Sequence, residues 1–147
     1  MKIKHLVALA SLLFLLSGFV WSQAEQKSYS YKFDKDMGDC LFTGVSKDAV
    51  WSATLKALML LKFQILSAEK ESGTISAIKT PSGFQSTMGV GSKSMPELNL
   101  VFEERDDGIA VLSTVIAGIN WPSKNRRDLE KKFYEKVAEL LYKPAEN

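Results

Sequence analysis

The chain contains one histidine and one cysteine in 147 residues. The histidine, His5, lies in a leader that we expect to be removed, so the mature chain would contain no imidazole. Histidine-activated serine and cysteine nucleophiles, and most zinc and copper sites, need that ring.

The acidic turn at Asp106 and Asp107 lacks the residue spacing of a calcium-binding loop. No convergent set of carboxylates or lysines is visible, and we predict a non-enzymatic protein without a cofactor or metal.

Cys40 is the single cysteine, so no disulfide can form within the chain. Stability must therefore come from packing. In an oxidising compartment a lone thiol can form a disulfide to another molecule or remain buried and inert. Its place beside Leu41 and Phe42, at the start of an expected strand, favours burial. Both alternatives stay open, and Cys40 is retained as a candidate free or intermolecular thiol.

The first 24 residues have the pattern of a cleavable export signal. Met1 to His5 is a short basic start, Leu6 to Val20 is apolar, and Ser22 to Ala24 places small residues at the spacing that a signal peptidase reads. The apolar run is shorter than the roughly 20 residues that span a bilayer. We therefore expect cleavage between Ala24 and Glu25, a periplasmic or secreted protein, and no transmembrane span after cleavage.

The excess of positive charge belongs to this leader. The chain has 19 basic and 17 acidic residues, and Lys2 and Lys4 account for the difference, so the remainder is formally neutral. Nucleic-acid binding requires clustered cations that neutralise phosphates, and a neutral chain argues against it. Peripheral contact of the last helix with a membrane is left open, since that helix carries several lysines and arginines.

Hydrophobic periodicity predicts one domain after the leader. Helical spacing of apolar residues indicates a helix over 48–62, capped by Ser46, and a last helix over 123–142 with Ser123 as a cap. Leu129, Phe133, Val137 and Leu140 mark the expected buried face of the last helix. Alternation indicates strands over 40–45, 63–68, 74–80, 98–103 and 109–117.

These elements define a two-layer α+β fold. We expect an antiparallel sheet with two helices on one face, in the order β-α-β-β-β-β-α. The domain should cover residues 40–143, followed by a tail at 144–147. Residues 25–39 are predicted to be a polar leader or an edge strand, because Tyr29 to Phe33 alternates between apolar and polar residues.

Parts of the pattern resemble small bacterial envelope domains. The segments concerned are Val50-Trp51-Ser52-Ala53, Lys62-Phe63-Gln64-Ile65, and Glu69 with Glu71-Ser72-Gly73-Thr74-Ile75. Uncharacterised lipoproteins are among those domains, and the helix-grip domains of the C subunit of the outer-membrane β-barrel assembly machinery are similar in layout. The resemblance implies a non-enzymatic accessory or interaction module. The chain departs from it by lacking a lipid-carrying cysteine.

The segment from Thr80 to Pro96 is the candidate partner-binding loop. It has no regular pattern over 17 residues, which is uncommon inside a compact domain and often functional. Its apolar residues could instead extend the flanking strands and pack on the core. The candidate anchors are Phe84, Met88, Val90 and Met95.

These observations lead to two functional hypotheses. The first is an exported accessory module that binds another envelope protein through this loop or through an exposed sheet edge. The alternative is a carrier that holds a lipid or another apolar small molecule between the sheet and its helices.

Overall fold

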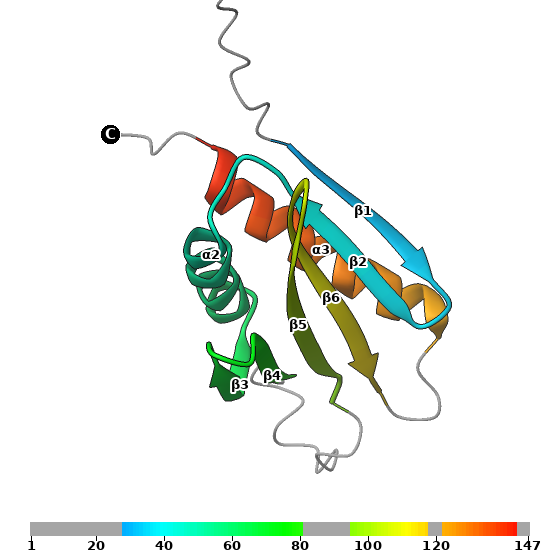
Figure 1. Cartoon of the computed structure of the whole chain (residues 1–147). Coiled ribbons are helices and arrows are strands. Elements are labelled where there is room, and N and C mark those ends of the chain that lie inside the picture. Colours follow the sequence, from blue (N-terminus) through cyan, green and yellow to red (C-terminus); the bar gives the residue numbers. More distant parts are fainter. Residues whose placement is uncertain (1–27, 81–94, 118–121, 144–147) are drawn as a thin grey trace, which may run out of the picture.

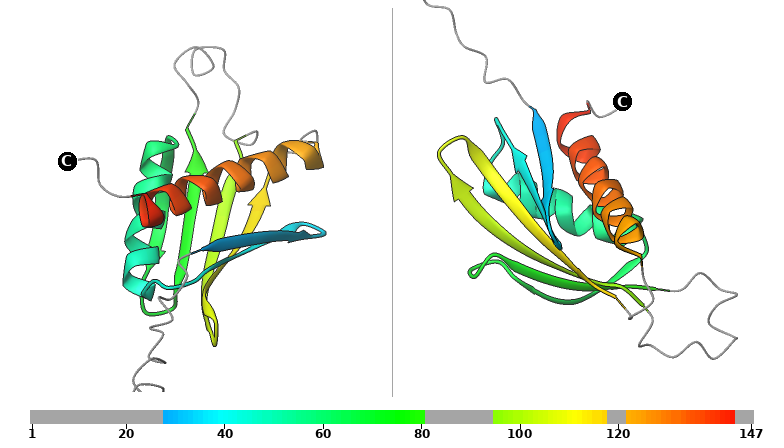
Figure 2. Two further views of the ribbon diagram at one scale, coloured as in Figure 1. Left: turned by 90° about the horizontal axis from the view of Figure 1, so that it is seen from above. Right: turned by 90° about the vertical axis from the view of Figure 1, so that its right-hand side faces the viewer.

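The structure is a computed structural model of the whole chain, and it describes residues 28–80, 95–117 and 122–143. Within these residues six strands form one antiparallel sheet, and two helices lie on the same side of it (Figures 1 and 2). The predicted two-layer α+β fold is confirmed. The elements are β1 (Tyr29–Asp34), β2 (Met37–Phe42), α2 (Lys47–Leu60), β3 (Phe63–Glu69), β4 (Thr74–Lys79), β5 (Glu97–Arg105), β6 (Gly108–Ile116) and α3 (Ser123–Tyr142).

The strands lie in the order β1-β2-β6-β5-β4-β3, so β1 and β3 form the two edges of the described sheet. Three hairpins account for most neighbours, and the pairing of β2 with β6 joins segments far apart in the chain. Strand β1 precedes the predicted elements and takes the edge-strand alternative for residues 25–39. Strand β2 begins at Met37, three residues before the predicted start at Cys40. The prediction was late because Gly38 and Asp39 do not continue the alternation of apolar and polar residues that marks a strand in the sequence.

Tyr142, near the end of α3, fastens the start of β1 to the domain. Its hydroxyl donates to the carbonyl oxygen of Ser28 at 2.7 Å and lies 3.1 Å from that of Thr43. Its ring stacks on Tyr29 with centroids 6.5 Å apart. Burial raises the pKa of Tyr142 to about 12, so the phenol keeps its donor proton at physiological pH. The segment before β2 is therefore a packed part of the fold.

Helix α2 has the predicted N-cap, Ser46, and a left-handed residue follows its C-cap, Leu61. The Ala49 amide donates to Ser46 Oγ at 3.2 Å, which satisfies one free amide of the first turn. At the other end Lys62 has φ of +65°, and Lys79 Nζ donates to the Leu61 carbonyl oxygen at 2.5 Å. Burial lowers the pKa of Lys79, and the charge of Lys132 adds to that effect. A cation at this carbonyl suits the negative end of the helix dipole.

The core fills the layer between the sheet and the helices. Phe42, Leu58 and Phe133 are completely buried, and Trp51 packs on Phe102 with ring centroids 5.0 Å apart. The prediction that Trp51 is a core residue is confirmed.

The β5–β6 turn depends on one glycine. Gly108 has φ of +154°, and a Cβ atom there would lie 2.2 Å from the Phe42 carbonyl oxygen. The two-residue loop between Arg105 and Gly108 can therefore form only with glycine at this position.

The buried face of α3 differs from the prediction. Phe133 and Val137 are buried as expected, whereas Leu129 and Leu140 are only half-buried. The buried face is rotated toward Glu130 and Tyr134, because both polar side chains form hydrogen bonds in the interior. The buried residues of α3 are Glu130, Phe133, Tyr134, Val137 and Ala138.

The start of α3 also differs. Pro122 occupies the N-cap position without a side-chain hydrogen bond, and Ser123 is the first helical residue, so the prediction that Ser123 is the cap is wrong. The Asn125 amide reaches back to the Pro122 carbonyl oxygen instead, at 2.9 Å.

Candidate functional site

Few of the site residues predicted from the sequence lie in the part of the chain that the structure describes. Phe84, Met88 and Val90 lie outside the described residues, as do Ala24 and Glu25 at the expected cleavage site. Loop binding and signal cleavage stay predictions. Met95 is described, and it is half-buried just before β5.

Cys40 lies in the core of the sheet. Its side chain is completely buried, opposite Tyr31 on β1 and Val111 on β6. Burial raises the pKa of its thiol, and the nearby charge of Asp39 raises it further. A protonated, enclosed thiol is a poor nucleophile. The geometry favours an inert thiol over a disulfide between chains, which would require the sheet to open.

A buried polar cluster joins α3 to the sheet. Its members are Ser113 on β6 with Glu130 and Tyr134 on α3, and each is 3% exposed or less. Ser113 Oγ donates to Glu130 Oε1 at 2.6 Å. The Tyr134 hydroxyl lies 2.7 Å from Ser113 Oγ and 3.1 Å from the Val111 carbonyl oxygen, so two acceptors are within its reach.

Gly38 makes room for this polar cluster. A Cβ atom at Gly38 would lie 2.6 Å from Ser113 Oγ and 2.9 Å from the Tyr134 hydroxyl. Burial raises the pKa of Glu130, against opposing hydrogen bonds from Ser113 and the Gly38 amide and the charges of Arg126 and Arg127. Burial likewise raises the pKa of Tyr134.

The polar cluster holds the helix in place and is not arranged for catalysis. No member reaches solvent enough to meet a substrate, and no imidazole adjoins Ser113 among the described residues. Buried, satisfied polar networks specify one packing arrangement, because any shift leaves a polar group unpaired. Sequence reasoning missed the polar cluster, although Glu130 falls at helical spacing with Phe133 and Val137.

The free edge of β3 is the more accessible feature. Strand β3 pairs with β4 only, and no other described segment covers its second side. Its register shifts between Ile65 and Ser67, which makes Leu66 the extra residue of a β-bulge, with 54% of its surface exposed. On the preceding helix, Met59 and Leu60 are also exposed, by 61% and 54%. We call β3 with Met59 and Leu60 the β3 edge.

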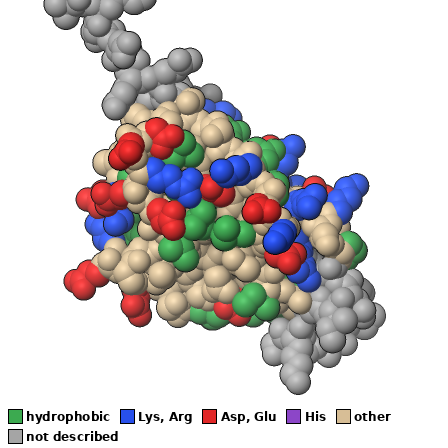
Figure 3. All heavy atoms as spheres, turned by 45° about the vertical axis from the view of Figure 1, so that its right-hand side comes forward, with side chains coloured by type: hydrophobic (Ala, Val, Ile, Leu, Met, Phe, Trp, Pro, Cys, Tyr) green, Lys and Arg blue, Asp and Glu red, His purple; other side chains and the backbone are tan. Residues whose placement is uncertain are grey.

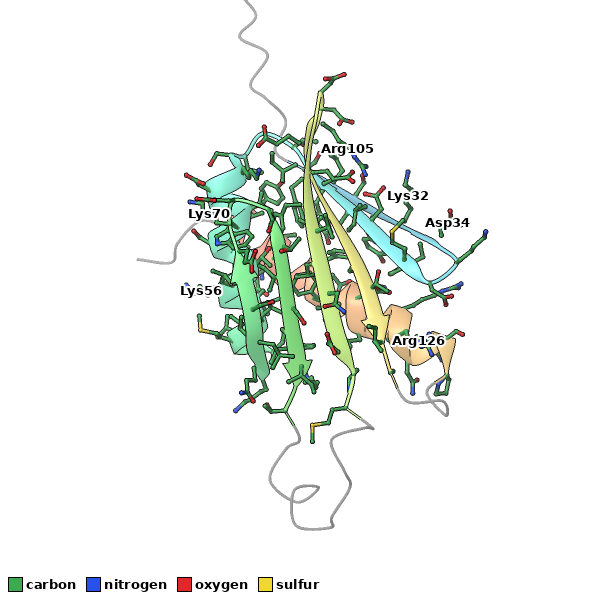
Figure 4. The ribbon with its side chains drawn as sticks, turned by 60° about the horizontal axis from the view of Figure 1, so that its bottom comes forward. Lys32, Asp34, Lys56, Lys70, Arg105 and Arg126 are labelled. Carbon is green, nitrogen blue, oxygen red and sulfur yellow. The ribbon has the colours of Figure 1, made fainter. Side chains whose placement is uncertain are left out.

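Helix α2 lies over this side of the sheet. Figure 2 shows α2 beside β3, and in Figure 4 Lys56 lies on that outer side of the molecule. A strand added to β3 would therefore meet both the free backbone of the edge and side chains of α2.

The sheet face away from the helices is mixed in character. Met37, Val101 and Ile116 are exposed there, alongside Arg105, whose Nη1 contacts both Asp39 carboxylate oxygens at 3.0 and 3.1 Å. Basic and acidic side chains are interspersed on the side that Figure 3 presents. Within the described ranges, no group of three or more acidic, cysteine or histidine residues is placed to hold a metal ion.

Part of the charge on the last helix is paired locally. Lys131 Nζ lies 3.9 Å from Glu135, and Lys136 Nζ lies 2.6 Å from Glu139, which Lys143 also approaches. Neither helix in the described part of the chain is long and apolar enough to cross a membrane. Peripheral membrane contact of the last helix stays a prediction.

Comparisons with known proteins give no family assignment. No protein-family model and no curated protein matches the chain. Among solved structures, the chain is similar to CalU16 from Micromonospora echinospora, at 15% sequence identity and a TM-score of 0.34. The match covers 82% of this chain and 100% of the CalU16 chain.

Proposed function

We propose that this protein is an exported, non-enzymatic module of the cell envelope that binds another protein through the β3 edge. Export is supported by the leader pattern of the first 24 residues, and the absence of histidine after it supports a role other than catalysis. The β3 edge supplies the binding surface.

The observation that carries this proposal is an open strand with apolar side chains beside it. An unpaired edge offers backbone donors and acceptors to a partner strand, and neighbouring apolar residues add affinity through burial. Between Phe63 and Ala68 the strand contains no lysine, proline or acidic residue. The bulge at Leu66 and the charge of Glu69 at its last residue are therefore the protective devices on the strand itself.

The opposite edge is better protected. Strand β1 carries Lys32 and Asp34, and charged side chains discourage edge pairing. It is also held by Tyr142 and by ring contacts to the helix layer. Two edges of one sheet thus differ in their suitability for a partner.

Site-specific photo-crosslinking in living cells tests the proposal. A photoreactive residue at position 66 should give a crosslinked protein adduct, whereas the same group at Lys32 on β1 should give little. Leu66→Lys should then weaken binding of the identified, purified partner at least tenfold without unfolding the domain. Equal crosslinking at both edges, or unchanged affinity of the variant, would contradict the role of the β3 edge.

A second variant tests the prediction that the partner binds the loop from Thr80 to Pro96. Replacing Phe84, Met88 and Met95 together with serine should abolish partner recovery if the segment from Thr80 to Pro96 supplies the anchors. If the loop variant loses the partner while Leu66→Lys retains it, the binding surface is the loop.

A further inference from the structure

From the charges around the β3 edge, we infer that its partner is a second copy of this chain, paired antiparallel through β3. The inference rests on the proposed binding role of that edge. It extends the role by naming the partner.

The two ends of β3 carry opposite charges that are unused within the described residues. Lys62 precedes the strand, Glu69 ends it, and Glu71 follows in the turn. None of the three forms an ion pair in the described part of the chain, and nor does Lys56 on α2. By contrast, Lys70 between the glutamates pairs with Asp48 at 2.9 Å. The edge thus has a basic end, an apolar middle and an acidic end.

This order is complementary to itself in one orientation only. In an antiparallel pair, Lys62 of each copy approaches the acidic end of the other. A parallel pair would instead place like charges side by side, which is unfavourable. A two-fold axis perpendicular to the sheet produces the antiparallel arrangement and repeats every contact twice.

The apolar residues fit the same arrangement. Ile65 and Leu66 lie in the middle of β3, between its charged ends, and would lie close to the two-fold axis. That axis preserves the faces of the sheet, so the α2 helices of both copies would lie on the same face of the joined sheet. Each helix would bring its exposed Met59 and Leu60 to the interface. The two six-stranded sheets would become continuous.

A charge-swap cycle measured by sedimentation velocity tests the inference. The intact exported chain should be a dimer at micromolar concentration. Lys62→Glu and Glu69→Lys should each raise the dissociation constant at least tenfold, since symmetry introduces every repulsion twice. The double variant should return to within about threefold of the wild type, because the reversed charges are again complementary. Lys32→Glu on β1 is the matched control and should leave the dimer unchanged.

The outcomes separate this inference from the proposed function. Circular dichroism verifies the fold of each variant, and Glu71→Lys replaces Glu69→Lys if the latter does not fold. A monomeric wild type, a double variant that stays dissociated, or an equal effect of Lys32→Glu would overturn the homodimer. If the protein is monomeric and Leu66→Lys still weakens a crosslinked partner, the homodimer falls and the binding role of the β3 edge stands. If the protein is monomeric and position 66 gives no adduct, both fall.

Discussion

Glu130 is an ionisable side chain buried between α3 and the sheet. It accepts a hydrogen bond from Ser113 at 2.6 Å and is 3% exposed. Burial disfavours its charged form and raises its pKa in the folded protein. Its contribution to stability should therefore depend on pH.

The direction of this pH dependence follows from the number of protons that the folded and unfolded states bind. Between the ordinary carboxyl pKa of about 4.3 and the raised folded value, the folded state binds more protons than the unfolded state, so rising pH costs stability. The contribution of Glu130 is fully present below that ordinary value and is lost as pH rises through the folded pKa. Glu130→Gln removes this dependence. Urea unfolding of both proteins from pH 4 to 8 should show the wild type losing stability relative to the variant as pH rises; a constant difference would contradict a raised pKa.

Thr54 is the second residue whose environment predicts an effect. Its hydroxyl is completely buried on α2 and has no hydrogen-bond partner among the residues that the structure describes. An unsatisfied buried hydroxyl costs free energy, so Thr54→Val should raise the free energy of unfolding by about 1 kcal/mol. Thr54→Ser keeps the hydroxyl, removes a methyl group and should destabilise the protein. Thermal or urea unfolding of the three proteins measures both changes, and a loss of stability in Thr54→Val would show that the hydroxyl has a partner.

At the scale of elements, two tight connections place a lysine where glycine is favoured. Lys35 in the β1–β2 hairpin has φ of +54°, and Lys62 after α2 has φ of +65°. A side chain in this region costs roughly 1–2 kcal/mol. Lys62 lies at the basic end of the β3 edge, and the proposed homodimer would give this strained residue a role in binding.

The hairpin supplies a direct test of that cost. Lys35→Gly should stabilise the protein by about 0.5–1 kcal/mol, since relief of the strain exceeds the added chain entropy of glycine. Asp36→Gly, one residue later, is the matched control. Asp36 lacks a positive φ, so the same change there should be destabilising. Urea unfolding decides between them, and two changes of the same sign would contradict the account.

Local patterns predicted most of these elements correctly. Trp51, Leu55 and Leu58 define α2, and the alternation through Leu98, Leu100 and Phe102 defines β5. The polar cluster was missed because burial of Glu130 depends on Ser113, 17 residues away. Which strands form the two edges of the sheet could not be predicted from the sequence either, because the strand order depends on the long-range pairing of β2 with β6. Sequence periodicity reports local structure, and partner choice between distant strands is decided by the whole fold.

At the scale of the whole molecule, the two edges and two faces of the sheet are unequal. The helices cover one face, and Tyr142 holds the start of β1. Within the described residues β3 pairs on one side only, and Leu66 on it is exposed. The proposed envelope location and the proposed binding role of the β3 edge are independent statements. Both can be addressed with a thiol at the edge, because the native Cys40 is enclosed and should not react until the protein unfolds.

The most direct measurement labels Leu66→Cys in intact cells with a small maleimide that does not cross the inner membrane. Ser30→Cys on exposed β1 is the control. We predict that the control reacts both in cells and after purification and dilution, whereas position 66 is protected in cells and becomes reactive once its partner dissociates on dilution. An unlabelled control in intact cells would contradict export, and equal labelling of both positions in cells would contradict an occupied β3 edge.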